Sequence, residues 1–414
     1  MVKKRLHRVI VVRGVLLLLY LFGVLFLSGC WDAMELNKRA VVSGIGIDLA
    51  EGEEKYLVSL QIIIADEISG KIGRGATPTS VYQAKGKTIV DAIRNSSRKV
   101  PRIVSPAQAR LIVMSEDVAR EGIGGIVDYL DRDSDIRLTA NVYVAKKGVS
   151  AMDILSALTP IGKISGYAVV QKTDMSSHEL GENYSVEVDD VIRGMLVSEG
   201  GPVLNGLTII GDIKKSGEKS NLESSSSPGV AMLYRMAVFK GDKMQLWLTE
   251  EECRGLVWIK NKMKKSVIVI QSEKDGEDIA MEVMRSRTRI KASLNDPEHP
   301  VIRLNVMTQF SIREVNSKID LRNPLELETL ENKVEQVIQK QMQTMVDKAQ
   351  SINCDVFTFS EVMERADPAQ WTKIKDRWGQ IFPKVKVEYH VDAVIRNSQM
   401  RDRSFKYYTS SGQE

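Results

Sequence analysis

The first thirty residues decide which part of this chain folds, because they have the order of a segment that is removed. Five basic residues precede an apolar run from Gly14 to Leu27, which ends in Leu27-Ser28-Gly29-Cys30. This order is typical of a bacterial signal peptide with a lipobox. Ser28 and Gly29 are small enough for a peptidase cleft, and the Cys30 thiol can carry a thioether-linked diacylglycerol. We therefore predict export, cleavage before Cys30 and lipid attachment at Cys30.

The competing interpretation is an uncleaved membrane anchor that contains a cysteine by chance. Its apolar core would span only the 14 residues from Gly14 to Leu27, whereas a helix that crosses a bilayer needs about 20. We expect Cys30 to carry a diacylglycerol and an N-acyl chain. Several acyl chains hold a protein on a membrane more durably than one, since each buried methylene contributes about 0.8 kcal/mol. No other cofactor and no metal is predicted.

Removal of residues 1–29 changes the charge of the protein. Those residues hold five of the 58 basic side chains and none of the 54 acidic ones, so the mature chain of 385 residues has a net charge of −1. A nearly neutral chain offers no bulk attraction for nucleic acid or for anionic lipid headgroups. Only Cys253 and Cys354 remain beyond Cys30, and we interpret both as small core residues.

The length predicts two or three domains, at roughly 100–200 residues each. Residues 214–229 contain a single strong apolar residue and many serines, and we expect this stretch to remain without structure. We therefore place the main domain boundary at residues 214–229. The predicted order is a signal peptide (1–29), an N-terminal domain (30–213), a Ser-rich linker (214–229), a C-terminal domain (230–405) and a tail (406–414).

The N-terminal domain is predicted to mix strands and helices. Residues 40–49 and 55–64 are β-branched runs that predict a hairpin, and residues 66–78 predict a loop. Further strands are expected over 80–84, 109–114 and 137–145, the last half-buried because Leu138, Ala140, Val142 and Val144 alternate with polar residues. Ser115 and the Ser150/Asp153 pair predict helix caps, and Gly122 predicts a helix end.

The C-terminal domain is predicted to contain a sheet crossed by one long helix. Strands are expected over 232–239, 243–248, 266–271, 279–290, 302–312 and 385–395. Pro324 after Asn323 predicts a helix start, and apolar residues from Leu327 to Ala349 continue one stripe for about seven turns. Residues 368–382 predict a further helix. The predicted fold class is α+β, with mostly antiparallel or mixed sheets covered by helices.

The sequence does not contain a recognisable catalytic constellation. His178, His299 and His390 are about a hundred residues apart, and each is predicted to lie on the surface or in a loop. Gly44-Ile45-Gly46 lacks the third glycine of a dinucleotide fingerprint. Asp131, Asp133 and Asp135 resemble the start of a calcium loop, but Ile136 and Val142 stand where that loop needs Gly and Glu. We predict that the chain is not an enzyme.

Motifs along the whole chain resemble the Ger(x)C spore germination lipoproteins. The mature start Cys30-Trp31-Asp32 with Gly44-Ile45-Gly46-Ile47-Asp48 resembles the start of that family. The other matching segments, in family order, are Gly86-Lys87-Thr88, Ala119-Arg120-Glu121-Gly122-Ile123, Ala237-Val238-Phe239-Lys240-Gly241-Asp242-Lys243, Arg254-Gly255-Leu256, Asp355-Val356-Phe357, Trp371 and Trp378. The sequence departs from the family near Ser105-Pro106, where a Ser-His pair is usual, and at Thr358 and Ser360, where glycines are usual.

The resemblance implies a non-catalytic C subunit of a nutrient germinant receptor. It implies a lipid-anchored position on the outer face of the spore's inner membrane, with a large A subunit and a polytopic B subunit as partners. We expect relative motion of the two modules about the linker to accompany a change in those partners. The alternative is a solute-binding lipoprotein of a transporter, whose sheets should be mainly parallel, whereas this chain predicts hairpins and one-faced strands.

Overall fold

A computed structural model describes residues 11–18, 20, 22, 38–69, 76–162 and 164–397 of the 414-residue chain. The chain divides into two units, Met1–Ala40 and Val41–Glu414. Apart from the first two residues of β1, every element below lies in the second unit. Within the described residues, the helices are all too short or too polar to cross a bilayer. The predicted tail, 406–414, lies outside the described residues.

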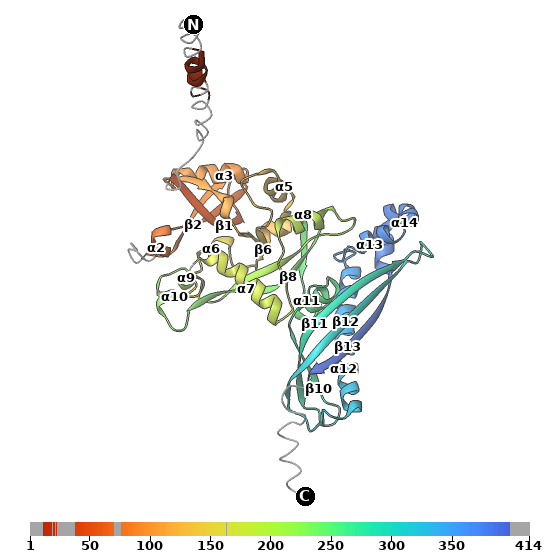
Figure 1. Ribbon diagram of the computed structural model, residues 1–414. Helices are drawn as coiled ribbons and strands as arrows, with labels where there is room; N and C mark the ends of the chain where they lie inside the picture. Colours follow the sequence, from red (N-terminus) through yellow and green to blue (C-terminus); the bar gives the residue numbers. More distant parts are fainter. Residues whose placement is uncertain are drawn as a thin grey trace, which may run out of the picture. The chain divides into compact units, whose positions relative to one another are not determined.

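The first sheet has nine strands in the described part of the chain, in the order β3-β2-β1-β5-β6-β7-β8-β9, with β4 beside β1 (Figure 1). The strands are β1 (Arg39–Leu49), β2 (Tyr56–Ile63), β3 (Thr79–Gly86), β4 (Ile103–Ser105), β5 (Leu111–Ser115), β6 (Asn141–Ala145), β7 (Val203–Gly211), β8 (Gly229–Lys240) and β9 (Lys243–Trp247). The pairs β1–β5, β5–β6 and β6–β7 are parallel, whereas β1–β2, β2–β3, β7–β8 and β8–β9 are antiparallel. The predicted hairpin of β1 and β2 and the predicted mixed sheet are confirmed.

Short helices connect these strands. They are α2 (Ala65–Ser69), α3 (Ile89–Asn95), α4 (Glu116–Glu121), α5 (Gly124–Arg132), α6 (Ala151–Ser156), α7 (Ser165–Glu179) and α8 (Val188–Leu196). The predicted caps are confirmed: Ser115 accepts a hydrogen bond from the third residue of α4, and Ser150 and Asp153 form a capping box. Gly122 ends α4 with a φ of 135° that favours glycine. Helix α2 occupies the start of a segment that was predicted to be a loop.

The prediction for residues 137–145 is wrong in extent and in burial. Strand β6 begins only at Asn141, and all five of its residues are buried. Neither face of β6 therefore meets solvent, which is usual for a central strand with parallel neighbours, here β5 and β7. Leu138, which was assigned to the buried face, precedes the strand and is exposed. The alternation of apolar and polar residues over 137–145 thus comes from a turn followed by a central strand.

The prediction that residues 214–229 lack structure is also wrong. They contain α9 (Ile213–Ser216, which starts one residue earlier) and α10 (Ser220–Glu223). Asn221 is fully buried, its side-chain amide donates to the carbonyl oxygens of Leu158 and Gly229, and its Oδ1 accepts from the Gly229 N–H. Polar side chains bonded to backbone order this segment without an apolar core. It joins β7 to β8, which are neighbours in one sheet.

The second sheet contains four strands in the described residues, β10 (Val267–Gln271), β11 (Asp278–Ser293), β12 (Val301–Val315) and β13 (Lys386–Asn397), in that order. The first three are antiparallel and β13 runs parallel to β12. Helix α12 (Pro324–Ser351) begins the long connection between β12 and β13 and runs along the sheet (Figure 1). Its cap Asn323, its extent and its buried stripe agree with the prediction.

Helix α11 (Glu250–Ile259) packs against α12, and α13 (Phe359–Ala366) packs near β11. Helix α13 was not predicted from the sequence. The single helix predicted over 368–382 is broken into α14 (Pro368–Ile374), a 3₁₀ turn, α15 (Trp378–Ile381) and a second 3₁₀ turn. The breaks bring the rings of Trp371 and Trp378 edge to face, with 5.2 Å between their centroids.

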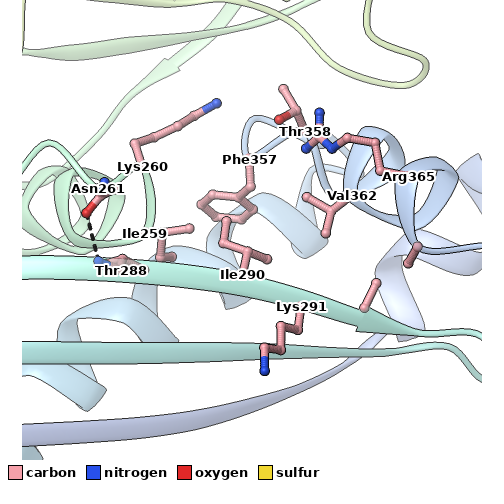
Figure 2. Close-up of a pocket in the computed structure, with 12 residues that line it drawn as sticks. Ile259, Lys260, Asn261, Thr288, Ile290, Lys291, Phe357, Thr358, Val362 and Arg365 are labelled. Carbon is pink, nitrogen blue, oxygen red and sulfur yellow. Dashed lines mark hydrogen bonds between the residues drawn. The ribbon is translucent and has the colours of Figure 1, made fainter.

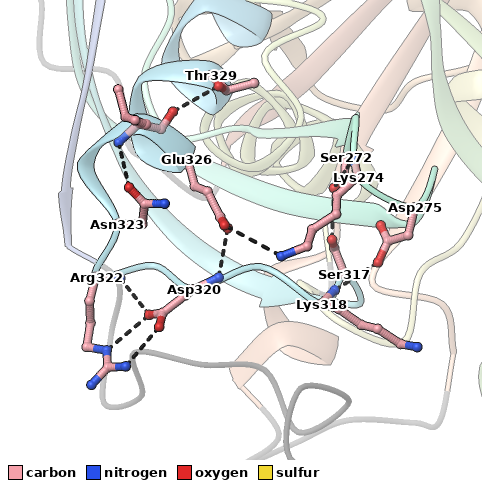
Figure 3. A network of polar contacts seen from close by, with 11 residues as sticks. Ser272, Lys274, Asp275, Ser317, Lys318, Asp320, Arg322, Asn323, Glu326 and Thr329 are labelled. Carbon is pink, nitrogen blue, oxygen red and sulfur yellow. Dashed lines mark hydrogen bonds and ion pairs between the residues drawn. The ribbon is translucent and has the colours of Figure 1, made fainter. Parts of the chain in front are cut away.

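A polar network fixes the end of the second sheet where α12 begins (Figure 3). The Glu326 carboxylate accepts the Asp320 N–H at 2.8 Å and lies 3.6 Å from the Lys274 amine. In the same corner, Ser272 and Ser317 share a buried hydrogen bond of 2.8 Å. These contacts tie the β10–β11 turn to the chain that leaves β12, so the start of α12 is fixed to the sheet.

Candidate functional site

The predicted lipid-attachment residue, Cys30, lies outside the residues that the structure describes. Its role therefore stays a prediction. The other two cysteines, Cys253 and Cys354, are buried and free. Burial raises the pKa of each thiol to about 12, so neither is a nucleophile near neutral pH.

The three histidines of the predicted mature chain lie on separate elements. His178 is in α7, with its Nε2 3.3 Å from the Lys264 amine. His299 lies in the β11–β12 turn, where its Nδ1 is 2.9 Å from an Asp296 oxygen, and its side chain is 85 % exposed. His390 is exposed on β13. The structure brings none of them together.

The three aspartates that resemble a calcium loop do not converge. Asp131 is in α5, Asp133 follows that helix, and the Asp133 carboxylate accepts the backbone N–H of Asp135. Asp131 and Asp135 are exposed, and Asp133 is half-exposed. Within the described residues, no three His, Cys, Asp or Glu side chains are placed to hold a metal ion. The segment is a helix end followed by a turn.

The glycines of the Gly44-Ile45-Gly46-Ile47-Asp48 motif make room for α6. A Cβ on Gly44 would lie 2.7 Å from a Leu155 methyl group, and a Cβ on Gly46 would lie 3.1 Å from that of Ala151. At the end of the motif, the buried Asp48 carboxylate accepts the Ala151 N–H at 2.9 Å. Burial raises the pKa of Asp48, although the hydrogen bonds from the α6 backbone oppose this. The motif packs and caps one helix.

Two further motifs meet each other. The β8–β9 turn at Gly241-Asp242 reaches the α4–α5 junction, where the Asp242 carbonyl oxygen accepts the Ile123 N–H at 2.9 Å. Beside it, the buried Glu116 carboxylate accepts from Trp247 Nε1 at 3.0 Å and from Arg120 at 2.7 Å. Burial would raise the pKa of Glu116, but these bonds together lower it. Segments about 120 residues apart in the sequence are joined here by family motifs.

The motifs of the C-terminal part also make internal contacts. Gly255 lies in the α11–α12 interface, where a Cβ would be 2.1 Å from the Gln341 carbonyl oxygen. The Asp355 carboxylate is buried and accepts from the backbone of Phe359 and Ser360 at the start of α13 and from Trp378 Nε1. Burial raises the pKa of Asp355 against the effect of these bonds. The motifs that carry the resemblance therefore define packing, and they do not converge on a reaction centre.

An apolar groove of about 1190 Å³ lies between α7 and β8. Its lining includes the exposed side chains of Ile161, Met175 and Met232. Lys172 also lines it, with its amine 2.8 Å from the Ala231 carbonyl oxygen, and burial lowers the pKa of Lys172. The groove suits an apolar group. No local pattern predicts this groove, because its walls come from four separate segments of the sequence.

A second cavity of about 590 Å³ lies between the end of α11, β11 and α13 (Figure 2). Its lining includes Lys260, Lys291 and Arg365 and contains no carboxylate or imidazole. Two lining residues, Asn261 and Thr358, have left-handed backbones with φ of 56° and 63°. Thr358 is one of the positions where the family usually has glycine, and the left-handed conformation supplies the reason.

Comparisons with known proteins agree with the motifs. Residues 32–209 match the family model described as spore germination protein N-terminal domain, and residues 235–399 match the model described as spore germination B3/GerAC like, C-terminal. Spore germination protein KC of Bacillus subtilis (strain 168) is 30% identical over 399 residues, which cover 95% of this chain and 97% of that protein. Spore germination protein B3 of the same organism is 23% identical, with 91% and 96% covered.

A solved structure shows the same fold. The crystal structure of the GerBC protein superposes with a TM-score of 0.52 at 18% identity, and it covers 88% of this chain and 100% of that chain. The predicted α+β class is confirmed by this likeness and by the two sheets with their helices. Both family models, a relative matched over nearly its whole length and this fold lead to one conclusion: the chain belongs to the Ger(x)C family of spore germination proteins.

Proposed function

We propose that this protein is the C subunit of a spore nutrient germinant receptor, held on the outer face of the spore's inner membrane by an acylated Cys30. The observation that carries the proposal is the match to spore germination protein KC over 97% of that protein's length. The two family models divide nearly the whole mature chain between them. The likeness thus extends through the regions of both models and is not confined to one of them.

In this proposal the subunit works by binding and not by catalysis. The groove beside α7 is lined mainly by apolar side chains, the cavity beside α13 has no carboxylate or imidazole in its lining, and the buried carboxylates of Asp48 and Asp355 already cap helices. Its partners are the A and B subunits of the receptor. A solute-binding lipoprotein is disfavoured because the second sheet is antiparallel except for β13, and the first sheet is mixed.

The lipid anchor is tested with Cys30→Ser. We expect the variant to keep residues 1–29, to gain their mass and to lose incorporation of labelled fatty acid, because the thiol that accepts diacylglycerol is absent. Ser28→Ala is the matched control, since it keeps a small residue before the cleavage site, and it should be processed and labelled normally. Cleavage of Cys30→Ser at the same bond, with fatty acid still attached, would remove the anchor from the proposal.

The receptor role is tested by crosslinking from the mature domain in spore membranes, followed by identification of the captured proteins. We expect the A and B subunits. A deletion strain should lose the response to a nutrient while it grows and imports solutes normally. Capture of transporter components alone, or an import defect with normal germination, would replace the receptor proposal with the transporter alternative.

A further inference from the structure

We infer that the outer face of the second sheet binds the headgroups of anionic phospholipids through Arg285, Arg287, Arg289 and Lys291, here called the basic row. The inference rests on one part of the proposed function, namely that the acylated Cys30 holds the chain beside a bilayer. It adds a second membrane contact, through folded protein.

The basic row follows from the period of β11. Its four members occupy every second position of one strand, so they project from the same face of the sheet. All four are exposed, whereas Thr288, between two of them, is buried on the opposite face. At about 3.3 Å per residue the row is roughly 20 Å long. The result is a row of four positive charges along one face of the strand.

No acid neutralises the basic row in the described part of the chain, where none of its members forms an ion pair. The residues opposite it on β12 are Gln309, Met307, Asn305 and Arg303. Arg303 is itself paired with Glu388 at 2.8 Å. Strand β13, two strands away from the row, carries Glu388 opposite Arg303 and Asp392 opposite Met307.

The other edge of the basic row is reached by the end of α11, where the Asn261 side chain accepts the Thr288 N–H. Strand β10 pairs with β11 only as far as Glu282, so in the described residues no strand lies beside residues 285–291 on that edge. Glu282, the acid at the end of the β10 pairing, forms an ion pair with Arg313. The positive field of the row is therefore uncompensated within the sheet, and it is available to an external anion.

A lipid surface fits this face better than an acidic protein does. Met307 is 56 % exposed and lies directly opposite Arg287, and Met284, beside the row at a bulge, is 52 % exposed. Cations with long apolar stems next to exposed apolar side chains suit the boundary between headgroups and acyl chains. Mobile headgroups adapt to any charge spacing, whereas a protein partner needs carboxylates at matched positions. The net charge of −1 for the mature chain hides this local attraction.

The experiment uses residues 31–414 without lipid, because Val41–Glu414 is a compact unit without the first forty residues. Cosedimentation at low salt compares vesicles of phosphatidylglycerol and phosphatidylcholine in equal amounts with vesicles of phosphatidylcholine alone. We expect binding to the mixed vesicles only, and its loss as salt is raised. Each cation near an anionic surface contributes about 1 kcal/mol, or about fivefold in affinity. Arg287→Gln with Arg289→Gln should therefore weaken binding about 25-fold.

The control removes the same charge elsewhere. The fourfold Gln variant of the basic row is compared with a fourfold Gln variant of four exposed lysines on other elements, Lys87, Lys147, Lys214 and Lys375. We expect the first to lose vesicle binding and the second to keep it within about threefold, while circular dichroism shows both folded. Equal losses in the two variants, or no binding of the parent chain to the mixed vesicles, would overturn the inference.

A protein partner is the remaining outcome. If the basic-row variant binds mixed vesicles normally but no longer crosslinks to its partners in spore membranes, the face contacts an acidic protein and the lipid inference is wrong. The vesicle assay uses a chain without Cys30, so its result does not depend on acylation. Failure of the anchor and failure of the basic row can thus be told apart.

Discussion

Gly255 is predicted to control how closely α11 approaches α12. A Cβ at this position would lie 2.1 Å from the Gln341 carbonyl oxygen and 2.9 Å from the Met345 Cβ. The first contact is with backbone, so no rotamer change relieves it, and the helices must separate by about 1 Å to reach an ordinary contact distance. The Trp258 Nε1–Gln341 Oε1 hydrogen bond of 3.0 Å joins the same two helices and would be stretched.

The magnitude for Gly255→Ala combines three effects. Overpacking costs about 2 kcal/mol, and a weakened buried hydrogen bond costs about 1 kcal/mol. The higher helix propensity of alanine returns about 1 kcal/mol. We expect the free energy of unfolding to fall by about 2 kcal/mol, measured by urea titration of residues 31–414 with tryptophan fluorescence.

The matched control is Gly125→Ala in α5. Gly125 is also helical, but a Cβ there would meet only the Tyr56 hydroxyl at 3.9 Å, which is an ordinary contact. This substitution should raise the free energy of unfolding by about 0.5 kcal/mol. If Gly255→Ala leaves the urea midpoint unchanged or raises it, or if both substitutions lower it equally, the close-approach argument is refuted.

Four further outcomes are expected. Asp48→Ala should lower the free energy of unfolding by about 2 kcal/mol in the same titration, because buried N–H groups of α6 lose their acceptor; a loss below about 0.5 kcal/mol would contradict this. Thr358→Gly should raise the free energy of unfolding by about 0.5 kcal/mol, since relief of a left-handed threonine at φ 63° outweighs the extra chain entropy of glycine in the unfolded state. A lower urea midpoint would contradict this and show that the Thr358 side chain is needed. The pKa of Glu116 is lowered on folding, so its stabilising contribution is complete above its ordinary pKa of 4.5 and is lost as the pH falls through the folded pKa. Glu116→Gln should therefore destabilise the protein at pH 7 and much less at pH 3. An equal loss of stability at both pH values would refute the assignment. Cys253 and Cys354, with pKa values raised to about 12, should resist a thiol reagent at pH 8 until urea unfolds the chain, whereas rapid labelling of the native protein would show that they are accessible.

The sequence predicts elements whose causes are local. Helix α12 begins and ends where Asn323, Pro324 and its apolar stripe place it, because capping and a 3.6-residue period are properties of neighbouring residues. Strand β12 is equally regular, and its alternate residues from Ile302 to Phe310 are buried as expected. The break of the helix predicted over 368–382 was missed because it depends on contacts of Trp378 with Asp355, which no local pattern reports.

The remaining errors have one physical source, which is structure built by distant partners. Hydropathy cannot show that Asn221 orders its segment through hydrogen bonds to Leu158 and Gly229. Nor can it show that β6 is covered on both faces. The apolar groove is assembled from segments up to about 90 residues apart, and its exposed apolar side chains, such as Ile161, Met175 and Met232, are scattered in the sequence. The basic row, by contrast, is visible in the sequence as Arg-Ser-Arg-Thr-Arg-Ile-Lys, but only the strand shows that the charges share a face.

The pairing of β7 with β8 has a consequence for chimaeras between members of this family. One family model ends at residue 209 and the other begins at residue 235, whereas β8 starts at Gly229 and takes its neighbour β7 from the first block. Exchange of one of these two regions between relatives thus pairs β7 from one protein with β8 from another. Such a hybrid keeps its fold only if the incoming strand preserves the alignment in which Leu207 faces Leu233.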